Sequence, residues 1–164
     1  MDTTEILIKI RKIVRSINIE SKKIQKEYGV SIPQVLCLNY LKNSKNYQAT
    51  QGQIKKFLNL NSSTVSGIIN RLEIKGLVAR LPKTGDKRVV NISLTSRGDS
   101  LLNNIPSLLQ VELSEKLKKL DQKTIIQIFE SLELLVNLLD INDVEAFFSV
   151  ASEEVNSEIN NQNS

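Results

Sequence analysis

The fold of this chain is decided by a stretch that reads NSSTVSGIINRLEIKG at residues 61–76, LVARL at 77–81, PKTGDKR at 82–88 and VVNISL at 89–94. In the first segment apolar residues recur at spacings of three and four, which indicates an amphipathic helix. The second and fourth segments are short and rich in Val, Leu and Ile, which favours strands, and the segment between them has the composition of a turn. The stretch therefore predicts a helix followed by a β-hairpin.

The predicted helix has two different faces. Its apolar stripe consists of Val65, Ile68, Ile69 and Leu72. Small polar side chains at a helix N-terminus allow close approach to DNA, where they can bond to base edges or phosphates. A solvated helix that is rich in serine has the same composition, so both interpretations stay open on this pattern alone. The candidate contact residues on the polar face are Ser62, Ser63, Thr64, Ser66, Gly67, Asn70 and Arg71.

Another helix is predicted directly before this one. Thr50 and Gln53 fit a capping box, in which each side chain bonds to the backbone of the other residue. A short apolar pattern follows, and residues 59–61 then form a turn whose last residue, Asn61, can cap the next helix. Two short helices joined by such a turn form a helix-turn-helix. Many helical proteins contain this arrangement without binding DNA.

The hairpin after the helix-turn-helix carries basic side chains at its tip. Gly85 marks the bend, and Lys83, Lys87 and Arg88 surround it. An Arg at such a tip can enter the minor groove of DNA, where negative potential is concentrated. Asp86 is predicted to support Arg88 by a charge-assisted hydrogen bond. A surface hairpin without a ligand is the alternative.

Residues 50–98 as a whole resemble the MarR family of bacterial winged-helix regulators. The resemblance rests on Ser63-Thr64-Val65, on Leu72-Glu73-x-x-Gly76-Leu77-Val78-x-Arg80, and on Asp86-x-Arg88-x-x-x-Ile92-x-Leu94-Thr95-x-x-Gly98. It implies a homodimer with one winged helix-turn-helix per subunit, the helix Asn61–Lys75 in the major groove and Arg88 in the adjacent minor groove. Members of this family mostly repress transcription, and many release DNA when a small-molecule effector binds. The sequence identifies no such ligand.

The flanking segments are predicted to be helical. Residues 5–27 carry an apolar stripe that ends before Gly29, and Ser31 and Pro33 begin the next helix, which contains Cys37 as a small buried residue. Two further helices are predicted over 95–120, with a bend at Pro106, and over 121–139. Their apolar residues exceed what a lone surface helix needs, which favours burial against a second subunit. A short helix is predicted within 141–150.

The predicted fold class is mainly α with a small β-hairpin wing. The predicted domains are an N-terminal dimerisation helix at 1–30, the DNA-binding winged helix-turn-helix at 31–98, C-terminal dimerisation helices at 99–150, and a disordered tail at 151–164.

The distribution of charge agrees with a DNA-binding middle segment. Residues 50–100 carry 9 Lys and Arg against 3 Asp and Glu, whereas residues 101–164 carry 4 against 11. A basic surface is what phosphate contact and counterion release require. The N-terminus lacks a secretory signal and no apolar run could span a membrane, so a cytoplasmic protein without a membrane partner is expected.

Composition also restricts the chemistry. The chain contains no His and a single Cys, so it lacks the usual ligands of zinc and the residues of Ser-His-Asp or Cys-His catalysis. No enzyme activity, metal or cofactor is therefore expected. The predicted function is a dimeric, sequence-specific transcriptional regulator that binds double-stranded DNA and acts as a repressor at a palindromic operator. The alternative is a winged-helix module that binds another protein and does not read DNA.

Overall fold

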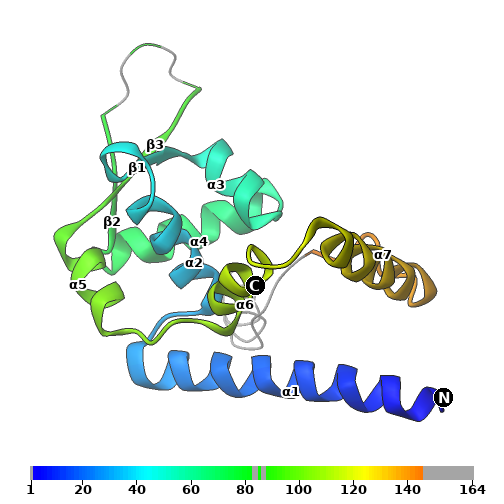
Figure 1. The fold of residues 1–164 in the computed structure, drawn as a ribbon. Coiled ribbons are helices and arrows are strands. Elements are labelled where there is room, and N and C mark those ends of the chain that lie inside the picture. The colour runs from blue at the N-terminus through cyan, green and yellow to red at the C-terminus, as the bar shows by residue number, and fades with distance from the viewer. Residues whose placement is uncertain (1, 83–84, 86–87, 146–164) are drawn as a thin grey trace, which may run out of the picture. The chain divides into compact units, whose positions relative to one another are not determined.

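The computed structural model describes residues 2–82, 85 and 88–145. The chain forms two compact units, one built from the residues up to Pro106 and one spanning Ser107–Glu145. The first unit contains five α-helices and a three-stranded sheet in its described residues, and the second contains two helices (Figure 1).

Helix α1, Thr3–Tyr28, lies along the side of the first unit that is opposite the hairpin (Figure 1). Asp2 caps its beginning, and Gly29 ends it with a φ of 69°, a left-handed conformation that glycine adopts without steric cost. The predicted helix and its glycine stop are confirmed. Several large apolar side chains of this helix are exposed: Ile6, Leu7, Ile13, Val14 and Ile19.

Helix α2, Ile32–Lys42, is the central element of the first unit. Ser31 and Gln34 form a reciprocal capping box and Pro33 lies in the first turn, as the sequence predicts for the start of this helix. Nearly every residue of the helix is buried, including Cys37. Burial raises the pKa of the Cys37 thiol to about 12, which confirms the prediction of a small buried residue.

The helix-turn-helix consists of α3, Gln51–Leu58, and α4, Ser62–Ile74. The predicted capping box between Thr50 and Gln53 is present, with both hydrogen bonds formed. Asn59 ends α3 in the left-handed region with a φ of 53°. The side chain of Asn61 then accepts a hydrogen bond from the Thr64 amide at 2.8 Å and caps α4. These local signals confirm the predicted turn.

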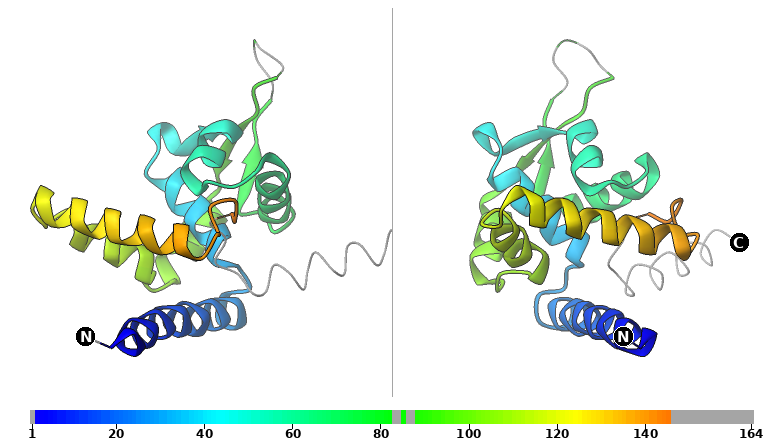
Figure 2. Two further views of the ribbon diagram at one scale, coloured as in Figure 1. Left: turned by 90° about the vertical axis from the view of Figure 1, so that its right-hand side faces the viewer. Right: turned by 45° about the vertical axis from the view of Figure 1, so that its right-hand side comes forward.

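The sheet has the order β1-β3-β2 with antiparallel pairs, where β1 is Gln48–Thr50, β2 is Val78–Arg80 and β3 is Asn91–Leu94. The two predicted hairpin strands are confirmed, although each is shorter than its apolar run. The described chain after β2 and before β3 continues outward from the ends of these two strands (Figure 2). Strand β1 was not predicted, because its three residues follow the 3-10 turn Lys45–Tyr47 and form no alternating pattern.

Helix α5, Ser96–Asn104, fastens the hairpin to the end of α4. The Thr95 hydroxyl donates a hydrogen bond to the Gly76 carbonyl at 2.7 Å and accepts one from the Gly98 amide at 3.1 Å. A Cβ atom on Gly98 would lie 2.2 Å from the Leu77 carbonyl oxygen. This close packing gives a structural reason for the Thr95 and Gly98 positions of the sequence motif.

One hydrogen bond joins the end of α1 to the end of α4. The Lys75 ammonium, just after α4, donates to the carbonyl oxygen of Gly29, which ends α1. Burial, and to a lesser extent the charge of Arg71, lowers the pKa of Lys75.

The apolar core of the first unit lies between α2, α3, α4 and the sheet. The predicted stripe of α4, formed by Val65, Ile68, Ile69 and Leu72, is buried in it, as expected. The other fully buried side chains of this core include Ile32, Val35, Leu38, Leu41, Ile54, Val78 and Ile92.

The second unit differs from the sequence prediction at its beginning. A single bent helix was predicted over 95–120, but α5 ends at Asn104 and a separate helix α6 runs over Leu109–Leu117. Ile105 is extended, with φ −81° and ψ 130°, because the residue before a proline avoids the helical region. Pro106 therefore separates two helices.

Helix α7, Gln122–Leu138, corresponds to the helix predicted over 121–139, and Asp121 caps its beginning. None of its residues, all of which the structure describes, is buried. A short helix was predicted within 141–150, and the part that the structure describes, residues 141–145, is not helical; Asp140, just before it, has a φ of 54°. The remainder of that prediction and the tail at 151–164 lie outside the described residues.

Within the described part of the chain, no helix is both long and apolar enough to cross a membrane.

Candidate nucleic-acid interface

The polar face of α4 lies on the outer side of the helix-turn-helix. Ser62, Ser63 and Asn70 are exposed, and the other predicted contact residues of this helix are partly exposed: Thr64, Ser66, Gly67 and Arg71. The apolar stripe of the helix holds it against the core. The structure thus brings all seven predicted residues of this helix to one solvent-accessible face.

Two of the small residues on this face have specific packing roles. The Ser66 hydroxyl accepts a hydrogen bond from the side-chain amide of Gln51 at 2.7 Å, which joins α4 to the start of α3. A Cβ atom on Gly67 would lie 3.4 Å from one terminal nitrogen of Arg71. The guanidinium of Arg71 therefore folds back along the helix over the position where Gly67 has no side chain.

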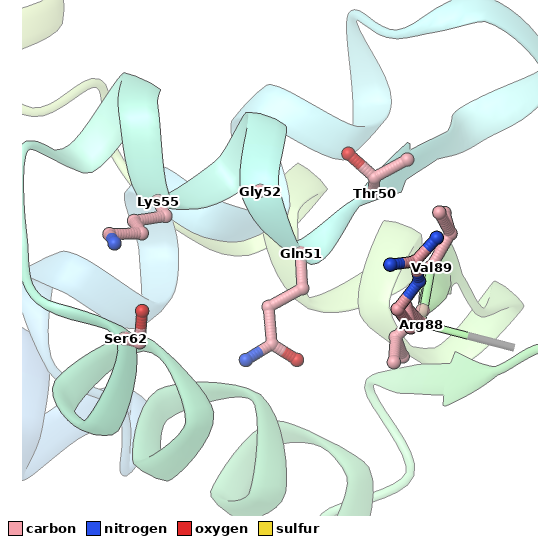
Figure 3. Close-up of a pocket in the computed structure, with 8 residues that line it drawn as sticks. Thr50, Gln51, Gly52, Lys55, Ser62, Arg88 and Val89 are labelled. Carbon is pink, nitrogen blue, oxygen red and sulfur yellow. The ribbon is translucent and has the colours of Figure 1, made fainter.

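A hollow of about 410 Å³ lies between the first turn of α3, the first turn of α4 and the chain entering β3. Figure 3 shows Lys55 and Ser62 on one side of the hollow, Arg88 on the other, and Gln51 between them. Lys55 of α3 and Arg88 of the hairpin thus both line the same hollow. The remaining lining residues are Thr50, Gly52, Val89 and Val90.

Gln51 and Lys55 were missed by the sequence analysis. The capping box at Thr50 placed the start of α3, and Lys55 follows one turn later, so helical spacing could have identified the pair. Their proximity to Arg88, 33 positions further along from Lys55, depends on the pairing of β3 with β1, which was not predicted.

The tip of the hairpin is described only in part. Gly85 has a φ of 76°, as expected for a bend that needs the left-handed region, and Arg88 is exposed. Lys83, Lys87 and Asp86 lie outside the described residues, and with them the predicted support of Arg88 by Asp86.

A polar cluster joins the second half of α4 to β2. The guanidinium of Arg80 donates to the side-chain oxygen of Asn70 at 2.6 Å and to the carboxylate of Glu73 at 3.1 Å. The backbone amide of Arg80 donates to the other oxygen of Glu73 at 3.2 Å. Asn70 was predicted as a contact residue, and the structure shows that its side chain is held by a strand of the hairpin.

A sequence comparison finds one family model that matches the middle of the chain. The model of the MarR family matches residues 30–90, which include the helix-turn-helix and most of the hairpin. Over these residues the chain is similar to the MarR family. This confirms the resemblance found in the sequence. The matched region begins at residue 30, whereas the motifs that suggested the resemblance lie within residues 50–98.

Characterised members of the MarR family align with parts of the chain. The regulator PecS of Dickeya dadantii is 41% identical over 59 residues, which are 36% of this chain and 36% of PecS. The repressor MdtR of Bacillus subtilis is 29% identical over 96 residues, 58% of this chain and 61% of MdtR. The multiple antibiotic resistance protein MarR of Escherichia coli is 33% identical over 70 residues, 43% and 49% of the two chains. The chain therefore spans from about a third to three fifths of the length of these relatives.

Solved structures of MarR-family regulators share the fold. The S. aureus MepR–DNA complex matches with a TM-score of 0.59 at 24% identity, covering 78% of this chain and 93% of MepR. Sco3205 of Streptomyces coelicolor, also in complex with DNA, matches with a TM-score of 0.61 at 19% identity, covering 87% and 92%. The predicted fold class, mainly helical with a small β wing, is confirmed.

Proposed function

We propose that this protein is a dimeric, sequence-specific DNA-binding regulator of transcription that acts as a repressor at a palindromic operator. The observation that carries this proposal is the exposed polar face of α4, beside a hollow that Lys55 and Arg88 both line. The polar face of α4 suits the base edges in the major groove of a DNA duplex, and the cations beside it suit the phosphates that border the groove. The relatives support it, since MdtR is named a repressor and MepR and Sco3205 were solved with DNA. A cytoplasmic location follows from this proposal.

In this proposal α4 enters the major groove. Ser62, Ser63 and Thr64 are at its leading end, where the small side chains and the positive end of the helix dipole favour a nearby phosphate. Asn70 and Arg71 come later on the same helix. Arg88 enters the adjacent minor groove, and Lys83 and Lys87 contribute to phosphate contact from the same hairpin.

The hollow beside α4 is proposed as a seat for the DNA backbone. Lys55 and Arg88 approach it from α3 and from the chain before β3, and Ser62 lies on the same side as Lys55 (Figure 3). A phosphodiester carries one negative charge and accepts hydrogen bonds, so it pairs with Lys55 there, next to the groove that Arg88 enters. Contacts of this kind position the protein on the duplex without reading sequence.

The dimer in this proposal uses the first and last helices. Large apolar side chains remain exposed on α1 and throughout α7, where Phe129 is 64% and Leu138 is 71% exposed. Exposed apolar area of this extent favours burial against another subunit. A two-fold dimer would present two copies of α4 about 34–36 Å apart, one turn of DNA, which matches a palindrome. Residues 1–30 and 99–150 are thus proposed as dimerisation segments and 31–98 as the DNA-binding domain. Release by a small-molecule effector is included on the family relationship alone.

The test is selection of duplexes from a random library by the purified protein, followed by titration of the recovered duplex at several salt concentrations. We expect a palindromic consensus and an affinity that falls steeply as salt increases, because phosphate contacts release counterions. A protein that enriches no sequence and binds no duplex at low salt is a protein-interaction module, the alternative reading of the same fold.

A further inference from the structure

Arg80 controls which atom of Asn70 is available on the outer face of α4. Asn70 and Glu73 are one turn apart on the helix, and the guanidinium of Arg80 lies between them, 2.6 Å from the Asn70 oxygen and 3.1 Å from the Glu73 oxygen. The backbone amide of Arg80 donates a second hydrogen bond to Glu73 at 3.2 Å, so Glu73 holds the strand β2 as well as the Arg80 side chain. Arg80 is only 31% exposed, so its position is set by packing as well as by these bonds.

The chemistry of arginine determines the orientation of the asparagine amide. A guanidinium has five N–H donors and no acceptor, so only the oxygen of Asn70 can face it. The bond is also charge-assisted and therefore stronger than one between neutral groups. The amide oxygen and nitrogen are on opposite branches of the same planar group. With the oxygen directed to Arg80, the NH₂ group of Asn70 is the branch left for a partner outside the protein.

The position of Asn70 makes this orientation relevant to base recognition. It is exposed, and it follows Ser63 and Gly67 at helical spacing on the polar face of α4. Asparagine commonly reads adenine with both amide atoms, donating to N7 and accepting from the N6 amino group. That contact needs the oxygen and the nitrogen to face the base together.

We propose, on the basis of the DNA-binding function above, that Arg80 is a positioning residue that makes Asn70 a reader of hydrogen-bond acceptors. Asn70 donates its NH₂ group to a single acceptor on the base edge, guanine O6 or N7, adenine N7 or thymine O4, and does not form the bidentate contact that selects adenine alone. Cytosine, whose major-groove edge presents an amino donor, is disfavoured at the same position. Arg80 itself does not touch the base. Its part is to hold the amide in one of its two orientations.

The test compares the sequences that the wild-type protein and three variants select from the same random duplex library. Asn70→Ala identifies the base position that Asn70 reads, because preference disappears there. Arg80→Ala frees the amide to turn, so we expect preference at that same position to weaken roughly tenfold and to admit cytosine, a change of the size of one base mismatch. Preferences at the other positions and the salt dependence should remain.

Glu73→Gln is the matched control. It removes the ion pair with Arg80 and its contribution to stability, but it leaves the bond from Arg80 to Asn70. We expect its selected sequence to equal that of the wild type. If Arg80→Ala keeps the wild-type preference, or if Glu73→Gln loses it to the same extent, the positioning role is refuted.

A measurement without an Arg80 variant covers the case in which Arg80→Ala does not fold. The duplexes carry an analogue at the identified position that removes or weakens one acceptor: 7-deazaguanine or 7-deazaadenine for N7, 6-thioguanine for guanine O6, and 4-thiothymine for thymine O4. The analogue that alters the acceptor bound by Asn70 is the informative one. We expect several-fold weaker binding by the wild type and no effect on Asn70→Ala. Equal losses for both proteins would overturn the assignment. A wild-type protein that selects no sequence at all would instead refute the proposed function, so the two failures are distinguishable.

Discussion

The α-carbon of Gly98 is so close to the carbonyl oxygen of Leu77 that a Cβ atom would lie 2.2 Å from that oxygen. The close approach allows the first turn of α5 to pack directly on the chain that leaves α4. The obstacle is a backbone atom, which cannot rotate away as the end of a side chain can.

Gly98→Ala is expected to destabilise the protein by about 1–3 kcal/mol or more, because the added methyl group forces the backbone of α5 or of residue 77 to move. Urea denaturation followed by circular dichroism measures the change. Gly52→Ala is the control, since its added Cβ would meet only the Thr50 hydroxyl oxygen at 3.9 Å. That control should be neutral or stabilising by about 0.5–1 kcal/mol, as for a helical glycine without close neighbours. Equal effects of the two substitutions would contradict the packing role of Gly98.

Lys55→Ala is expected to weaken binding to all duplexes to a similar degree and to reduce the salt slope by about one, as loss of a phosphate contact does. Titration of the selected duplex and of an unrelated duplex at several salt concentrations measures both effects. Lys56→Ala is a matched control, because Lys56 is the exposed neighbour on α3 that does not line the hollow. A loss of affinity for the selected sequence alone would indicate a base contact at Lys55.

Arg88→Ala is expected to weaken binding to the selected duplex by about 1–3 kcal/mol while the protein remains folded and its oligomeric state is unchanged. The reason is the loss of a cation from the minor groove, where the DNA potential is most negative. Fluorescence anisotropy measures the affinity. Arg97→Ala serves as the control, since Arg97 is an exposed arginine of α5 outside the hollow and the face of α4. Unchanged affinity of the Arg88 variant would remove this residue from the interface.

Phe129→Glu is expected to weaken self-association by about 2 kcal/mol or more, or roughly 30-fold in the dissociation constant, because it would bury a charge at the proposed dimer interface. The side chain is 64% exposed, so the substitution should cost the single subunit little. Sedimentation velocity over a range of concentrations measures the effect. Glu130→Gln, at the next position, changes charge without removing apolar area. Wild-type protein that is monomeric at every concentration would refute the dimer.

The Cys37 thiol is expected to react with a coloured disulfide reagent at least about 10³-fold more slowly in the native protein than in urea, because reaction requires unfolding. Burial raises its pKa from 9.0 to about 12, so the folded thiol stays protonated where the unfolded thiol ionises. The folded state then binds the extra proton, and this group's contribution to stability is lost as pH rises from about 9 towards 12. Absorbance at a mildly alkaline pH follows the reaction. Rapid modification of the native protein would show that the residue is accessible.

Features that depend on neighbours in the sequence were predictable. The caps at Ser31, Thr50, Asn61 and Thr95 satisfy amide groups within three residues, so a short motif is sufficient to identify them. The buried stripe of α4 follows from helical period alone, and the polar face opposite it could be named for the same reason.

Features that depend on distant segments were not predictable in this way. Strand β1 is only three residues long and exists because β3 pairs with it, which no local pattern reports. The same pairing brings Arg88 to the hollow that Lys55 lines. Arg80 was recognised as part of a family motif without a role, because its contact with Asn70 depends on how β2 packs beside α4. The apolar pattern continues past Pro106, but the helix does not. The proline keeps Ile105 out of the helical conformation, and α5 ends there.

The hydrogen bond from Lys75 to the Gly29 carbonyl joins the end of the long helix α1 to the end of α4, the helix proposed to read DNA. The 26 residues of α1 correspond to a rod of about 39 Å, at 1.5 Å per residue. If the rod turns about its tethered end by roughly 5°, its far end is displaced by about 3 Å. Conversely, if a second subunit displaced the N-terminal end of α1 by that distance, the helix would turn by a few degrees about its other end. That small rotation would be passed to the end of α4 through the Lys75 bond. In the proposed dimer, the spacing of the two α4 helices on DNA would therefore depend on the angle at which the two α1 helices meet.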